Sequence, residues 1–185
     1  MEKKKSSFKS TNKTMSNQYN EISENILNEI TKCILSVNTK ETKKLCSEII
    51  KAKKVFLIGV GRVNLSLQCF GKRLAHLGIN VEIIGSITEK PATNKDLLII
   101  ASGSGESIIP LNIAKKAKIY KTRIGLITSV QKSSIKKLAN FSVTLKTPTK
   151  KVKHGKIQNQ SLSDKASKVE SVQPMSSLFD QTLHI

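Results

Sequence analysis

The stretch LLIIASGSGES, residues 97–107, decides the fold of this chain. Its first five residues are a short, continuous apolar run, which predicts a strand buried on both faces, as in a parallel sheet. The run passes directly into alternating serines and glycines, and apolar residues at helical spacing follow over 108–117. A strand, a glycine-rich turn and a helix in this order are one repeating unit of a parallel α/β sheet.

The same unit recurs along the chain. The further predicted strands are VFLIG (55–59), VEIIG (81–85), IGLIT (124–128) and FSVTL (141–145), and the further predicted helices are 63–77 and 133–139. Two amphipathic helices, which begin near Tyr19 and Thr42, precede the first strand. The pattern predicts an α/β fold: a three-layer α/β/α sandwich around a five-stranded parallel sheet, flavodoxin-like or Rossmann-like in type.

Length and composition fit one folded domain with tails. The chain has 185 residues, of which 38% are hydrophobic, and no apolar run approaches the roughly 18 residues that a membrane helix requires. The N-terminus lacks the apolar segment of a signal peptide, so we expect a cytoplasmic protein with no membrane partner. Cys33, Cys46 and Cys69 show no CxxC or Cys/His spacing, which favours reduced packing residues over a metal site.

The formal net charge of +19 is the most unusual property of the composition. We expect a disordered basic tail at 1–18, a folded domain at 19–185, and a Lys/Ser-rich loop at 146–172 within that domain. The positive excess favours anionic ligands. Aromatic residues make up only 4% of the chain and do not interleave with basic ones, so nucleic acid is not the expected partner. It stays an alternative through the lysine tails, with an affinity that would fall steeply with salt.

The residues after each predicted strand are the candidate site, because ligands of such folds bind beyond the carboxyl ends of the strands. Residues 102–107 place three serine hydroxyls and two glycines at the start of a helix, which predicts a phosphate cradle. They are not a P-loop, because the closing Gly-Lys-Ser/Thr is missing. A structural helix cap is the alternative, but a cap needs only one such residue. Thr128 and Ser129 follow the fourth strand and open at the same edge.

A second turn, GVGRVN at 59–64, follows the first strand. It matches the dinucleotide fingerprint GxGxxG at two glycines, but Asn64 stands at the third. Glu82 lies about where a ribose-binding acid would, which leaves a nicotinamide nucleotide as an alternative. A plain strand-to-helix turn with an exposed Arg62 is the other interpretation. We expect no cofactor and no metal.

Several segments, taken in order, resemble one family. SGSGES after an apolar strand is similar to the phosphosugar-binding signature of the sugar isomerase (SIS) domain. With GVGR (59–62), RLAHLG (73–78), DLLIIASGSGES (96–107) and QPMSSLFDQTL (173–183), the chain resembles the 6-phospho-3-hexuloisomerases over about residues 20–185. The resemblance implies an isomerase of the ribulose monophosphate pathway of formaldehyde assimilation. Its reaction interconverts 3-hexulose 6-phosphate and fructose 6-phosphate through an enediol, with no metal or redox cofactor.

The resemblance also implies roles for single residues. Arg62 would contact the substrate or its phosphate, and His76, at the family's active-site histidine, would transfer a proton at oxygen. Asp180 takes the place of a family glutamate and would be the base at carbon. The implied phosphate-binding residues are Ser102, Gly103, Ser104, Gly105 and Ser107.

The chain departs from the family pattern at three places. Val63 and Asn64 replace a Ser-Gly pair, Asp180 is one methylene shorter than glutamate, and the sequence stops at Ile185 where the family continues into a long final helix. We therefore expect a truncated C-terminal helix. The alternative function is a noncatalytic sugar-phosphate-binding module, or a degenerate copy of the isomerase. Because the family forms tetramers, we expect a homo-oligomer, either a dimer or a tetramer.

Overall fold

The computed structural model of the chain contains a five-stranded sheet that is parallel throughout. It describes residues 2–148, 171, 173 and 177–185, with side chains from residue 17 onward. The spatial order of the strands is β2-β1-β3-β4-β5. The strands are β1 (Val55–Ile58), β2 (Val81–Ile83), β3 (Leu97–Ala101), β4 (Arg123–Thr128) and β5 (Phe141–Thr144). The predicted α/β class and all five predicted strands are confirmed.

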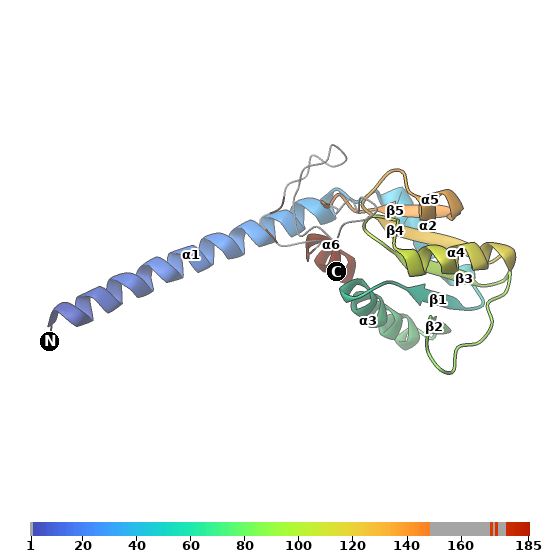
Figure 1. Cartoon of the computed structure of the whole chain (residues 1–185), viewed down its shortest axis with the longest axis horizontal. Helices are drawn as coiled ribbons and strands as arrows, with labels where there is room; N and C mark the ends of the chain where they lie inside the picture. Colours follow the sequence, from blue (N-terminus) through green and yellow to red (C-terminus); the bar gives the residue numbers. More distant parts are fainter. Residues whose placement is uncertain (1, 149–170, 172, 174–176) are drawn as a thin grey trace.

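Helices cover both faces of this sheet (Figure 1). In the described part of the chain they are α1 (Glu2–Leu35), α2 (Thr39–Lys51), α3 (Arg62–His76), α4 (Ile108–Ile119), α5 (Ser134–Leu138) and α6 (Ser177–His184). Buried side chains of α2, α3 and α6 share one core with the sheet, and those of α4 and α5 share the other. The architecture is the predicted three-layer α/β/α sandwich.

The continuous apolar run of β3 follows from its place in the middle of the sheet. Leu97 and Ile99 belong to the core under α2, α3 and α6, whereas Leu98 and Ile100 belong to the core under α4 and α5. Because successive side chains of a strand point to opposite faces, a strand covered on both sides must be apolar at every position. The run 97–101 therefore fixes the layering as well as the strand.

The N-terminal helix α1 extends away from the α/β body, and only its end beside α6 and α2 packs on that body (Figure 1). It begins at Glu2 and runs without a break through residue 18. Residues 2–18 are therefore helical, whereas the sequence predicts a disordered tail there. A physical reason is that the sequence contains no glycine or proline before Gly59. Residues 149–170 and 172 of the predicted Lys/Ser-rich loop lie outside the described residues.

No helix in the described part of the chain is both long enough and apolar enough to span a membrane. The three cysteines are free thiols, and only Cys33 is buried.

Gly125 allows β4 and β5 to pack closely, and its replacement tests that packing. Gly125 pairs with Phe141 in the register of the two strands, and a Cβ added to it would lie 2.5 Å from Cζ of the Phe141 ring. We expect Gly125→Ala to destabilise the fold by about 1–3 kcal/mol, because the added methyl group and the tip of the Phe141 ring cannot both keep their places. Thermal unfolding should show a decrease in Tm of about 2–4 °C for each kcal/mol.

The double variant Gly125→Ala/Phe141→Leu is the control. If the clash with the ring is the cause, the double variant is more stable than the sum of the two single effects allows. Simple additivity of the two single effects would contradict this explanation.

Candidate active site

The loop after β3 is held by its own serines. The Ser102 hydroxyl lies 3.0 Å from the Ser107 hydroxyl and accepts a hydrogen bond of 3.0 Å from the Gly105 N–H. Ser102 is only 3% exposed, whereas Ser104 and Ser107 are half-buried. The two ends of the loop are therefore tied together, and its open part lies around Ser104 and the start of α4.

The N-terminus of α4 lacks a side-chain cap. Ser107 stands at the N-cap position but makes no capping hydrogen bond, and the first helical bond runs from the Leu111 N–H to the Ser107 carbonyl. The N–H groups of Ile108 and Ile109 precede that bond, and Pro110 has none to offer. Uncapped N–H groups at the positive end of a helix dipole favour an anion.

Glu106 caps a different helix from the one it precedes. Its carboxylate accepts a hydrogen bond of 2.7 Å from the Ser134 N–H, the first residue of α5. Glu106 therefore forms a helix cap across two loops rather than on α4. Its charge is thereby directed away from the N-terminus of α4.

The loop also rests on the turn between β4 and α5. The Gly103 carbonyl accepts hydrogen bonds from the Ser129 N–H (3.0 Å) and the Thr128 hydroxyl (3.1 Å). Gly105 has a φ of +65°, and a Cβ added to it would lie 2.5 Å from Cβ of Ser133. A residue other than glycine there would be strained by its backbone and would overlap Ser133. The turn that begins with Thr128 and Ser129 thus opens at the same edge as the β3 loop, as the sequence predicts.

The C-terminal helix α6 lies against this loop. Phe179 is 1% exposed, and a Cβ added to Gly103 would be 3.5 Å from its ring, which is ordinary van der Waals contact. Neither Phe179 nor Ser133 is predicted from the sequence as a site residue. The signal that could have found Phe179 is an aromatic residue directly before the candidate base.

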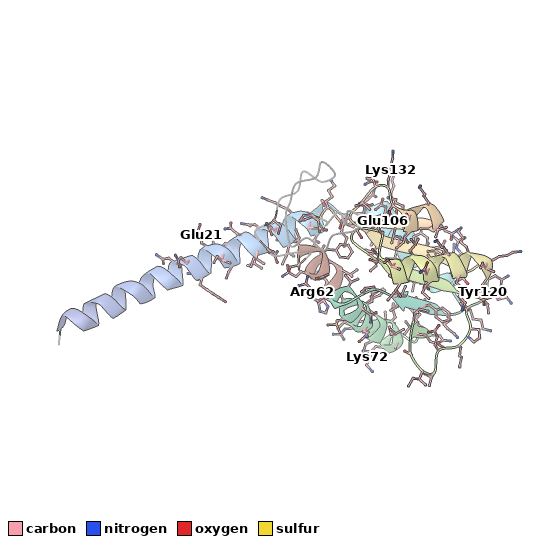
Figure 2. The ribbon with its side chains drawn as sticks, viewed as in Figure 1. Glu21, Arg62, Lys72, Glu106, Tyr120 and Lys132 are labelled. Atoms are coloured by element: carbon pink, nitrogen blue, oxygen red, sulfur yellow. The ribbon has the colours of Figure 1, made fainter. Side chains whose placement is uncertain are left out.

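Arg62, which is labelled in Figure 2, is the first residue of α3 and forms an ion pair with Asp180 of α6. Arg62 Nε lies 2.8 Å from Asp180 Oδ2, and the two side chains are 59% and 13% exposed. Burial raises the pKa of the Asp180 carboxyl, and the charge of Arg62 works in the opposite direction. The effect of burial is the larger one, so the pKa of Asp180 lies above the ordinary aspartate value. The counter-ion, Arg62, is largely exposed.

His76 lies apart from the other candidate residues. It is the last residue of α3, whereas Arg62 is the first, and the side chain is exposed. A rise of 1.5 Å per residue places the two about 21 Å apart along the helix. Within one chain, the structure brings together the β3 loop, Arg62 and Asp180, but not His76.

The groups that suggested a nucleotide have other partners. Glu82 Oε1 lies 3.1 Å from the Lys54 ammonium, and Glu82 Oε2 accepts a hydrogen bond of 2.7 Å from the Lys90 N–H. Both oxygens of the proposed ribose-binding acid are thus used inside the protein. Among the described residues, no group of three or more His, Cys, Asp or Glu side chains is placed to hold a metal ion.

Known proteins resemble this chain in sequence and in fold. The 3-hexulose-6-phosphate isomerase of Bacillus subtilis (strain 168) is 33% identical over 158 residues, which are 85% of this chain and 79% of that protein. A crystal structure of a hypothetical protein from Methanococcus jannaschii, whose inferred function is 3-hexulose-6-phosphate isomerase, is 30% identical. It has a TM-score of 0.66 and matches 91% of this chain and 83% of that one.

A more distant structure shares the fold alone. The Vibrio vulnificus NanR protein, complexed with ManNAc-6P, has a TM-score of 0.63 at 15% identity, covering 70% of this chain and 51% of that one. No known family model matches the chain. The fold is that of the SIS domain, and the similarity to the Bacillus subtilis enzyme extends over most of both chains. The chain therefore belongs to the family of the 3-hexulose-6-phosphate isomerases, the 6-phospho-3-hexuloisomerases of the SIS-domain superfamily.

Proposed function

We propose that this protein interconverts 3-hexulose 6-phosphate and fructose 6-phosphate, a reaction of the ribulose monophosphate pathway. The observation that carries the proposal is the convergence of three elements: the serine loop after β3, Arg62 at the start of α3, and Asp180 on α6. A phosphate site, a cation and a half-buried carboxylate are what an enediol isomerisation of a sugar phosphate requires. Family membership supports the same assignment, and the complex of the Vibrio vulnificus protein with ManNAc-6P is consistent with it.

The phosphate would lie at the N-terminus of α4. There the hydroxyls of Ser104 and Ser107 can donate hydrogen bonds to the phosphate. The backbone at Gly103 and Gly105 would keep the loop in its conformation through the hydrogen bonds that their carbonyls accept. Ser102 would contribute through its bond to Ser107, because the residue itself is only 3% exposed. Arg62 is exposed enough to swing toward the phosphate without unfolding any packed structure.

The proton transfers can be written for fructose 6-phosphate as substrate. The Asp180 carboxylate takes the proton from C3, and the electron pair of that C–H bond forms the C2–C3 double bond of the enediol as the C2 carbonyl oxygen gains a proton. The protonated Asp180 then returns a proton to C2, and the oxygen on C3 loses its proton to become the new carbonyl. The raised pKa of Asp180 suits this role, because a base that must also donate works best near the operating pH.

His76 fits the proton transfer at oxygen only if another copy of the chain supplies it. The separation of about 21 Å along α3 is too long for the histidine to reach a substrate at Arg62 of the same chain. We therefore place His76 at the site of a neighbouring copy in a homo-oligomer.

Solvent exchange tests the reaction itself. In D2O, fructose 6-phosphate incubated with the protein should lose its C3 proton signal in the NMR spectrum, and the 3-hexulose isomer should appear. Asp180→Asn should lower the exchange rate by about 10²–10⁴-fold, as expected for loss of a general base. Glu106→Gln is the matched control, because it removes a nearby carboxylate that only caps α5.

The competing outcomes are distinct. Loss of the C1 proton instead would indicate an aldose–ketose isomerase. If the sugar phosphate raises Tm but no proton exchanges, the protein is a binding module rather than an isomerase.

The pH profile tests the ion pair. Asp180 must be ionised to act, so kcat/KM falls as the pH drops through its pKa. Arg62 lowers that pKa, so Arg62→Gln should raise it and move the acid limb of the profile to higher pH.

Lys72→Gln provides the comparison for that profile. It removes a positive charge from the same helix, at an exposed position in its second half (Figure 2), and should leave the limb where it is. The pKa of the substrate phosphate is the same for every variant, so its ionisation cannot explain a shift of the limb between variants. An unshifted limb in Arg62→Gln would show that Asp180 is not the group being titrated.

Complementation tests the place of His76. His76→Gln and Asp180→Asn should each be inactive when pure. Co-expressed, the two variants should regain about a quarter of the wild-type activity. Random pairing makes half of all dimers heterodimers, and each heterodimer has one intact site out of two. Failure to regain activity, in a preparation shown to contain heterodimers, would place His76 outside the site.

A further inference from the structure

A cavity of about 350 Å³ lies on the α4 side of the sheet, away from the serine loop. Its walls come from α4, the segment between β2 and β3, and the middle of β1 and β3. It includes Thr122, directly before β4, which is the opposite end of the strands from the serine loop. In Figure 2, Tyr120 at its edge and Arg62 at the candidate active site lie at opposite sides of the α/β body. This volume lies within the range typical of small-molecule sites.

The interior of the cavity is apolar. Phe56 and Leu98 contribute from the sheet, Ile113 and Ala117 from α4, and Ala92 from the connection. Ala117 and Ala92 are small, which is what leaves the space open. Among these apolar side chains the hydroxyls of a sugar would find no partners, so a sugar buried there would lose hydrogen bonds to water without replacement.

The edge of the cavity is basic. Lys90 and Lys116 line it together with Tyr120, which is 50% exposed, and neither ammonium belongs to an ion pair among the described residues. Glu89 lies there as well, but its carboxylate accepts a hydrogen bond of 2.7 Å from the Gly85 N–H, which ties it to the backbone. Lys116 complements the dipole at the end of α4, whereas Lys90 comes from another segment, where its charge also acts on Glu82.

We propose that this cavity is a second ligand site, which binds an organic anion with a ring-sized apolar body. The body would fill the space between Phe56, Leu98 and Ala117, and the anionic group would pair with Lys90 and Lys116. The site is separate from the serine loop and does not depend on the proposed isomerase reaction. Its occupant would contact the C-terminal half of α4, the helix whose N-terminus forms the phosphate cradle.

The probe is 8-anilinonaphthalene-1-sulfonate, which carries aromatic rings and one sulfonate. Titration of the full chain, followed by fluorescence and calorimetry, should show one saturable site per chain. Lys116→Glu should weaken binding by about tenfold or more, as expected for loss of a charge-assisted contact. Ala92→Phe should abolish binding by filling the cavity. The neutral N-phenyl-1-naphthylamine, which lacks the sulfonate, should bind more weakly than the anion.

The matched control is Lys72→Glu, which reverses an exposed charge on α3, on the other side of the sheet. It should change the affinity by less than about twofold, because exposed charges far apart are screened. Saturating fructose 6-phosphate should not displace the probe, and Lys116→Glu should keep the exchange activity of the unmodified chain.

Four outcomes would overturn the proposal. They are unsaturable binding, binding unaffected by both Lys116→Glu and Ala92→Phe, equal affinity for the neutral probe, and displacement by the sugar phosphate. None of them bears on the isomerase, because solvent exchange measures that activity separately.

Discussion

The contact between Phe179 and Gly103 is the constraint on which the candidate site depends. It joins the C-terminal helix to a loop from the middle of the chain, and the ring lies so near Gly103 that a Cβ there would already touch it at van der Waals distance. The buried ring anchors α6, and the next residue, Asp180, is thereby brought to Arg62. A residue larger than alanine at 103 would push the helix outward and move the Asp180 carboxylate away from Arg62, although the sheet below would be unchanged. The packing of Phe179 therefore sets where Asp180 lies, and the charged side chains supply the chemistry of the candidate site.

The serine loop is held in place by hydrogen bonds within the protein. The carbonyls of Gly103 and Gly105 accept hydrogen bonds from the turn after β4 and from α5, and two of the serines bond to one another. A loop that is already ordered loses little conformational entropy when a phosphate arrives, so more of the binding energy remains for the transition state. Arg62 is the opposite case, because its side chain is largely exposed and is held only at its contact with Asp180, which a phosphate could replace. A phosphate that draws Arg62 away would leave Asp180 buried with less compensation, and so a stronger base.

Much of the fold could be predicted from the sequence because its signals are local. A run such as LLIIA must be a strand covered on both faces, and glycines such as Gly78 mark where helices end. The loop after β3 could be predicted for the same reason, since its hydroxyls and glycines are adjacent in the chain. The pairing of Arg62 with Asp180 could not, because it joins residues 118 positions apart through a packing contact that no local pattern encodes. The helical state of residues 2–18 could not be predicted either, because a polar composition indicates disorder more strongly than the absence of glycine and proline indicates a helix.

The charge of the protein is distributed in a way that suits both proposed sites. No Asp or Glu occurs between Glu106 and Asp164, so all charged side chains of α4, β4 and α5 are positive. Within that region, Arg123 is held at 2.6 Å by Glu48 of α2, and Glu106 itself is committed to the cap of α5. The remaining lysines therefore create a positive potential on the side of the sheet where α4 begins at the proposed phosphate site and ends at the cavity. Such a potential raises the rate at which small anions encounter the surface, and it acts at both ends of the helix. Selection between anions must then come from short-range chemistry: hydroxyls and free N–H groups at one end, and an apolar cavity at the other.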